Sequence, residues 1–426
     1  EIYTSLFVGS VRCVKRQALI MVVTIAVPML TASCKGGKGR GGEVPVRDTI
    51  PLKPQVKQVV LYLDASVSMQ GYLTASKSTN FGAVANAIEG LVPNNKSTYL
   101  FKDKPENIDD LSTKIRDNRV ALDAQESDLR RMISIMAEGA YKSDTTCYFL
   151  LTDGILSGSN KQINNSPNRS YNITNATDLS QGIYNTLKPY KGKLSGMVLQ
   201  YEAPFNGRYS KYNNDAVTLS NVMRPYYVIA LGAPHIIQQI HKDITAEKRS
   251  ALAGYKNESL FGFDFEMNSP QMRDNQTGVI FLDQKYKIQS KASSVVLEYD
   301  VSKLPSSLLS DIDSLIKHTT IITCNDRENQ QLINGENYNI KCTDKLLTIH
   351  IKDKTDLCIP GKLLIRLGWW MPSWIEKLTD RQDTNPKNCQ TFNLAYLLGP
   401  FSVLNNGKNG GFLDNEDSNI IELTNK

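Results

Sequence analysis

Short runs of consecutive apolar residues alternate with helical patterns between residues 56 and 250, and this alternation constrains the fold most. Residues 59–63 and 147–151 are apolar throughout, as in strands that are buried on both faces of a sheet. Between them, Leu129, Met132, Ile133 and Met136 recur at helical spacing in residues 127–140. The alternation predicts an α/β domain over residues 56–255, with a mostly parallel sheet flanked by helices.

The remaining elements of this domain are shorter. The pattern predicts helices at residues 81–91, 182–187 and 236–244, and strands at residues 98–101, 197–201 and 226–231. Residues 157–181 are rich in Asn and Ser and are expected to form a long loop.

The chain changes character after residue 255, where the helical periodicity fades. Leu347, Ile349 and Ile351 alternate with polar residues, a pattern typical of half-buried antiparallel strands. We expect strands at residues 278–282, 295–301, 319–324, 346–351 and 363–367. Residues 256–426 are therefore predicted to form a β-rich, sandwich-like domain.

The first residues resemble a bacterial lipoprotein signal. Basic residues precede an apolar run at residues 18–30, which is too short to span a bilayer, and small residues then lead to Cys34. By this resemblance, residues 1–33 are a signal peptide, Cys34 is lipidated, and residues 34–55 form a flexible, glycine-rich tether. The protein would then be exported and lipid-anchored in the cell envelope, periplasmic or surface-facing. Alternatively, an ordinary signal peptidase cuts the chain and Cys34 is incidental.

Composition argues against several classes of function. Lys and Arg number 49 against 43 Asp and Glu, and no basic run with interleaved aromatic residues occurs, so we expect no nucleic-acid binding. The four His residues form no HExxH pair, and the seven Cys residues form no CxxC pair. Cys324, Cys342, Cys358 and Cys389 could form two disulfides after export or remain free thiols.

Polar residues follow both buried strands. Asp64, Ser66 and Ser68 come directly after residues 59–63, and Asp153 follows the strand at residues 147–151. In a parallel sheet these strand ends meet at one edge, where open α/β sheets place ligands. One carboxylate and two small hydroxyls can converge on a hard cation such as Mg²⁺, which prefers oxygen ligands.

These residues resemble the metal-ion-dependent adhesion site of the von Willebrand factor A (vWA) domain family, a Rossmann-like fold. Asp64, Ser66 and Ser68 match its DxSxS motif, and Asp153 matches its later Asp in a Thr-Asp-Gly turn. The family has a separate Thr between them; here Ser127 offers the same hydroxyl at the head of a helix. The resemblance implies Mg²⁺, Mn²⁺ or Ca²⁺ with one coordination position open to an acidic side chain of a protein partner.

The resemblance favours a binding protein for adhesion or complex assembly, not an enzyme. A metal-dependent hydrolase using the same carboxylates is the first alternative, although the sequence offers no candidate general base beside the motif. A metal-free structural component of the envelope is the second alternative. In that case Asp64 and Ser66 would only cap a turn.

Aromatic segments offer further candidates for ligand binding. Residues 204–209 and 224–227 could line a groove, and Trp369, Trp370 and Trp374 could bind carbohydrate. Because aromatic side chains near turns and tryptophans in general are mostly buried, we expect all of them to serve packing.

Overall fold

The computed structural model describes residues 55–74, 80–124, 127–156, 173–211, 215–244, 252–263, 267–324, 330–383, 385–405 and 420–425. The signal peptide predicted at residues 1–33, the lipidation site Cys34 and all but the last residue of the tether lie outside these residues. Within them, no helix is both long enough and apolar enough to span a bilayer.

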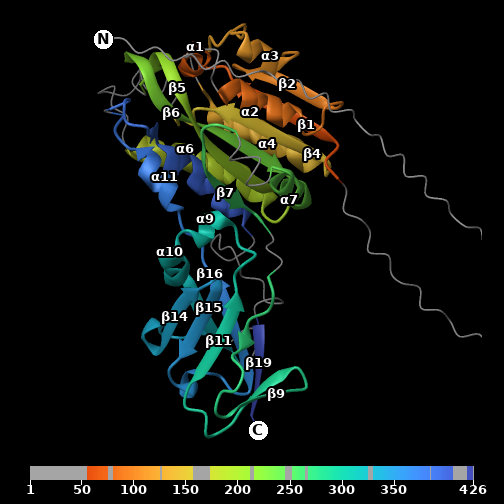
Figure 1. Ribbon diagram of the computed structural model, residues 1–426, viewed down its shortest axis with the longest axis vertical. Helices are drawn as coiled ribbons and strands as arrows, with labels where there is room; N and C mark the ends of the chain where they lie inside the picture. The colour runs from red at the N-terminus through yellow and green to blue at the C-terminus, as the bar shows by residue number, and fades with distance from the viewer. Residues whose placement is uncertain are drawn as a thin grey trace, which may run out of the picture. The chain divides into compact units, whose positions relative to one another are not determined.

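A seven-stranded sheet forms the first part of the fold (Figure 1). Its order is β3-β2-β1-β4-β6-β5-β7. The strands are β1 (Gln58–Asp64), β2 (Lys96–Phe101), β3 (Pro105–Asn107), β4 (Thr146–Thr152), β5 (Ser195–Ser210), β6 (Ala216–Gly232) and β7 (Tyr255–Phe261). The strands predicted from apolar runs, at residues 59–63, 98–101, 147–151, 197–201 and 226–231, all lie within these elements.

The sheet is mixed, so the expectation of a mostly parallel sheet holds for only part of it. β1 runs parallel to both β2 and β4, whereas β3, β6, β5 and β7 are joined to their neighbours by antiparallel pairing. The reason is that β5 and β6 form a hairpin, which cannot be parallel, where a doubly wound fold would place another crossover helix.

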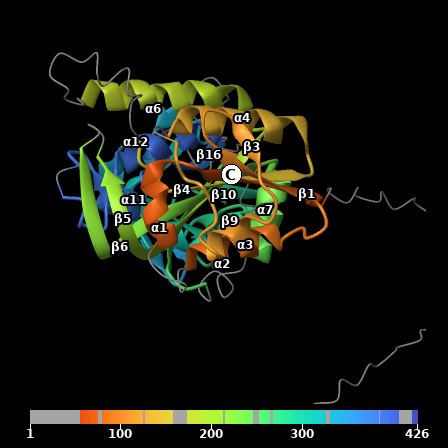
Figure 2. The same cartoon turned by 90° about the horizontal axis from the view of Figure 1, so that it is seen from above.

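Helices cover both faces of this sheet (Figure 2). One face packs against α2 (Asn80–Glu89), α3 (Leu111–Arg116) and α7 (Pro234–Asp243), and the other against α4 (Leu129–Lys142) and α6 (Ile173–Leu187). In β1, Leu61 and Leu63 enter the first buried cluster, while Val60 and Tyr62 enter the second. Burial on both faces explains the continuous apolar runs of the central strands.

The prediction of a loop over residues 157–181 is wrong for its last part, which is helical. Residues 173–181 belong to α6, and residues 157–172 lie outside the described part of the chain. The Asn- and Ser-rich sequence has weak helix propensity, so packing of α6 against α4 and a later segment overrides it.

The β5–β6 hairpin is longer than the strands beside it. β4 pairs with β6 only as far as Thr152 opposite Tyr227, but the hairpin continues to Ser210 opposite Ala216. It therefore extends past the carboxyl end of β4. α1 (Gln70–Thr74) packs on this extension, where the ring of Tyr72 meets that of Phe205 edge-on at 5.1 Å. The aromatic segments at residues 204–209 and 224–227 are thus mostly strand residues in packing contacts.

Two further sheets confirm the β-rich character of the second part. The six-stranded sheet has the order β13-β12-β16-β19-β10-β9 and the four-stranded sheet the order β14-β15-β11-β8. Their strands are β8 (Gln271–Met272), β9 (Val279–Leu282), β10 (Lys285–Ile288), β11 (Val295–Asp300), β12 (Thr319–Cys324), β13 (Gln330–Leu332), β14 (Tyr338–Thr343), β15 (Leu346–Ile351), β16 (Gly361–Leu367) and β19 (Ile420–Asn425). Short helices α9 (Ser306–Leu309) and α10 (Ile312–Lys317) precede β12. Alternate residues of β15 are buried, as its sequence pattern predicted, and alternate residues of β11 are buried as well.

The expected boundary between residues 255 and 256 falls inside β7, which belongs to the seven-stranded sheet. The chain also returns to this sheet after β16. The returning elements are α11 (Ser373–Leu378), β17 (Thr379–Asp380), β18 (Thr391–Phe392), α12 (Leu394–Leu398) and the 3₁₀ helix η5 (Gly399–Leu404). Ile375, Leu397 and Phe401 join the buried cluster of α4 and α6. The α/β part is therefore assembled from two stretches of sequence.

Two of the tryptophans serve packing, and three of the cysteines are free thiols. Trp370 and Trp374 are buried, and the Trp374 indole N–H donates to the backbone oxygen of Glu258. Cys342, Cys358 and Cys389 are free thiols.

Candidate metal centre

The parallel pairing of β1 and β4 brings the two carboxylates of the motif to one edge. Leu63 lies opposite Leu151, so both strands end at the same level. Asp64 is the last residue of β1, and Asp153 follows the last residue of β4. Both side chains are buried.

Hydroxyl and amide donors surround the Asp64 carboxylate. The Ser66 N–H donates to Oδ1 at 3.0 Å. Oδ2 accepts from the Ser127 hydroxyl at 2.7 Å and from the Thr152 hydroxyl at 2.8 Å. Three separate segments thus converge on one side chain. Ser127 reaches it because Ala124, three residues earlier, pairs with Ser66 in an isolated parallel bridge.

The side chains of the motif's two serines, Ser66 and Ser68, connect Asp64 to Asp153. The hydroxyls of Ser66 and Ser68 lie 3.1 Å apart, and the Ser68 hydroxyl hydrogen-bonds the Asp153 carboxylate. Asp153 Oδ1 also accepts from the backbone N–H of Ile155 at 3.2 Å. The structure therefore brings together all five residues singled out from the sequence as metal ligands: Asp64, Ser66, Ser68, Ser127 and Asp153.

Thr152 is the residue of this cluster that the sequence analysis missed. Its hydroxyl donates to Asp64 and accepts from the backbone N–H of Gly154 at 3.1 Å. A signal was available, because Thr152 stands next to Asp153 at the end of an apolar strand, where a buried hydroxyl needs a polar partner.

Burial makes both carboxylates costly to ionise. It raises the pKa of Asp64, an effect that the hydrogen bonds from Ser127, Ser66 and Thr152 oppose. Burial, together with the negative charge of Asp64, raises the pKa of Asp153 to about 6. The hydrogen bonds from Ser68 and Ile155 and the positive charge of Arg224 act in the opposite direction. Two buried carboxylates side by side favour either a shared proton or a bound cation.

Arg224 is the buried positive charge in this neighbourhood. Its guanidinium carbon lies 4.5 Å from the centre of the Tyr209 ring, and Nη1 donates to the backbone oxygens of Pro386 and Asn388. Nη1 is thus bonded to the returning chain, whereas the buried Nε has no hydrogen-bond partner among the described residues. The charge of Arg224 lowers the pKa of Asp153, but one guanidinium balances only one of the two carboxylates.

The returning chain also holds the turn after β4. Gly154 adopts a φ of +71°, a conformation that side chains disfavour, and a Cβ there would lie 2.7 Å from the Tyr227 ring. The Tyr227 hydroxyl is hydrogen-bonded to that of Thr391, and the Leu156 N–H donates to the backbone oxygen of Phe392. Residues distant in the sequence thereby fix the position of Asp153.

The donor set suits a hard, oxygen-seeking cation. It consists of two carboxylates and several neutral hydroxyls, without a His or Cys ligand among the residues just described. Among the described residues, no group of three or more His, Cys, Asp and Glu side chains is placed to hold a metal. A cation at Asp64 and Asp153 would therefore depend on serine hydroxyls and water for its remaining ligands.

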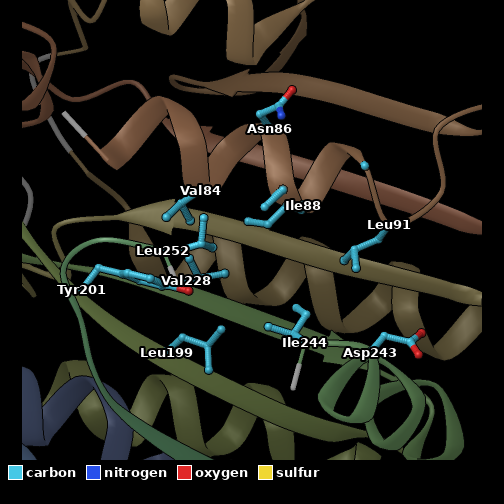
Figure 3. Close-up of a pocket in the computed structure, with 12 residues that line it drawn as sticks. Val84, Asn86, Ile88, Leu91, Leu199, Tyr201, Val228, Asp243, Ile244 and Leu252 are labelled. Atoms are coloured by element: carbon cyan, nitrogen blue, oxygen red, sulfur yellow. The ribbon is translucent and has the colours of Figure 1, made fainter. Parts of the chain in front are cut away.

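A pocket of about 610 Å³ lies elsewhere on the α/β part (Figure 3). Its walls are mostly apolar and come from α2, β5, β6 and the end of α7, with Asn86 and Asp243 among the polar residues. None of the residues of the carboxylate cluster lines it, so the pocket is separate from the candidate metal centre.

Comparison with known proteins adds no relative from which a function could be transferred. No protein-family model matches the chain, and no curated protein sequence matches it.

Proposed function

We propose that this protein is a cell-envelope lipoprotein whose vWA-like domain binds a protein partner through a divalent cation. Mg²⁺ is the favoured ion, with Mn²⁺ and Ca²⁺ as alternatives. Export, the lipid at Cys34 and membership of the vWA family are parts of this proposal and rest on the sequence patterns.

One observation carries the proposal. Asp64 and Asp153 are buried side by side at the carboxyl edge of β1 and β4, with the hydroxyls of Ser66, Ser68 and Ser127 around them. Burying two carboxylates beside the single positive charge of Arg224 leaves one negative charge unbalanced, and a divalent cation would supply the missing charge. Hydroxyl ligands, being neutral, would leave the cation strongly attractive to a further anionic ligand.

The partner follows from this charge balance. Two carboxylates balance a divalent cation, the surrounding hydroxyls add no charge, and the buried guanidinium of Arg224 leaves the neighbourhood with a net positive charge. A carboxylate of a partner protein can then displace a water molecule from the cation and form a charge-assisted contact. The protein's role in this proposal is capture, with an acidic side chain of the partner as the recognised group.

Removing one hydroxyl tests the metal site with little risk to the fold. We expect Ser68→Ala to weaken Mg²⁺ and Mn²⁺ binding by at least about tenfold, a free-energy change of about 1.4 kcal/mol, because a ligand oxygen is lost. The measurement is calorimetric titration of each ion into the purified full chain at pH 7.5.

Ser112→Ala is the matched control. Ser112 is 8% exposed and Ser68 is 9% exposed, but Ser112 lies on α3 and contacts none of the cluster. Its variant should bind both ions like the wild type. Equal binding by the Ser68→Ala and wild-type proteins, or no saturable binding by folded wild type, would contradict the proposal.

A further inference from the structure

The hairpin formed by β9 and β10 exposes an unusual amount of apolar side chain. Ile280, Phe281 and Leu282 are 44%, 61% and 46% exposed, and they are consecutive in β9. β9 is the last strand in the order of the six-stranded sheet and pairs with β10. Edge strands usually carry charges or proline that discourage association, but β9 has neither.

Both faces of this edge strand are apolar. Successive residues of a strand point to opposite faces, so Phe281 lies on one face and Ile280 and Leu282 on the other. Adding a partner strand would satisfy the backbone edge but would leave these side chains in water. An environment that is apolar on both faces of the strand would bury all three side chains at once.

Basic residues flank the apolar strand. Lys285 and Lys287 lie on β10 and Lys291 follows it, whereas Asp283 in the turn is the one acidic residue of segment 279–291. Lys285 pairs with Glu422 at 2.9 Å. The segment as a whole therefore carries excess positive charge beside its apolar strand.

We propose that the β9–β10 hairpin docks on a lipid bilayer that contains anionic headgroups. Ile280, Phe281 and Leu282 enter the interface, and Lys287 and Lys291 contact the headgroups, the arrangement of an interfacial anchor. Docking is shallow, because the edge of β9 that pairs with no further strand among the described residues needs hydrogen bonds that headgroups and water supply and hydrocarbon does not.

A local fluorescent probe tests this inference on the full chain. In Phe281→Trp, emission from the introduced indole is measured with phosphatidylcholine vesicles, with and without phosphatidylglycerol, and with brominated lipids as quenchers. We expect a blue shift and at least about twofold quenching on the anionic vesicles. Wild type supplies the background of the native tryptophans. Tyr141→Trp is the control, because Tyr141 is 52% exposed on α4, and its probe should stay unquenched.

Charge reversal tests the electrostatic part. In the Phe281→Trp background, Lys287→Glu with Lys291→Glu should weaken vesicle binding of the probe by roughly 30-fold, since each lysine near an anionic surface contributes about a factor of five. Reversing two exposed lysines elsewhere, Lys317 and Lys377, should leave it unchanged.

Two results would overturn the proposal. One is the absence of quenching in Phe281→Trp on vesicles of either composition. The other is a concentration-dependent blue shift without lipid, accompanied by dimers in sedimentation, because a second copy of the chain would then cover the hairpin. Since the probe reports on position 281 alone, neither result depends on the lipid at Cys34 or on the metal site.

Discussion

Replacing Gly154 by alanine is expected to destabilise the protein by about 3 kcal/mol. The left-handed conformation costs a residue with a Cβ about 1 kcal/mol or more, and overlap in a packed core costs a further 1–3 kcal/mol, roughly. The overlap here is with the Tyr227 ring, which cannot retreat because it is fully buried and its hydroxyl is bonded to Thr391. Urea denaturation of the full chain measures the loss.

The same substitution should weaken Mg²⁺ binding by more than tenfold, because Gly154 directly follows Asp153 and any shift of the turn moves that carboxylate. Gly335→Ala is the control, since a Cβ at Gly335 meets no atom within 4 Å. Its stability should change by less than about 0.5 kcal/mol. A Gly154→Ala protein as stable as wild type would show that the turn adapts and does not hold Asp153 rigidly.

In chelator, the contribution of Asp153 to stability is expected to fall by about 3 kcal/mol as pH rises from 3 to 7. Its pKa is raised to about 6 in the folded protein from the usual 3.8, so the folded state holds the proton more tightly than the unfolded state. The stabilisation is therefore complete below about pH 3 and is lost as pH rises through about 6. Urea denaturation at several pH values measures it.

Asp153→Asn isolates this effect from the other titrating groups. Asparagine keeps an oxygen for the Ile155 N–H but does not titrate, so the stability difference between wild type and variant should change with pH as just described. At pH 7, saturating Mg²⁺ should raise the stability of the wild-type protein but hardly change that of the Asp153→Asn variant. The reason is that only the ionised carboxylate binds Mg²⁺. A stability difference that is independent of pH would contradict the buried, proton-binding state of Asp153.

The central strands and the candidate site could be predicted because their signals are local. β1 and β4 are buried on both faces and therefore appear in the sequence as unbroken apolar runs. The rule that parallel strands end at one edge then places Asp64 beside Asp153 without further information. Ser127 was predicted because the resemblance to the vWA family calls for a hydroxyl between the two strands and Ser127 stands at the head of a helix there; its hydroxyl lies 2.7 Å from Asp64.

What the sequence did not predict depends on contacts between distant residues. α6 begins at Ile173 within a polar stretch, because its packing partners supply the stability that its composition lacks. The antiparallel β5–β6 hairpin replaces a crossover, a choice that no local pattern reveals. Similarly, Arg224 has partners in residues 386 and 388, which no periodicity connects to it.

The return of residues 373–404 to the first sheet affects the order in which the chain can fold during synthesis. Domains often fold as they emerge, from the N-terminus onward. Here the apolar face of α4 and α6 gains Ile375, Leu397 and Phe401 only after the strands of the β-rich part up to β16 have been made. The turn that holds Asp153 waits for the same residues, through Phe392 and Thr391. The nascent α/β part thus stays incomplete until residues 373–404 have been made. Under the proposed export, a chain that completes its α/β part late would stay open for translocation for longer.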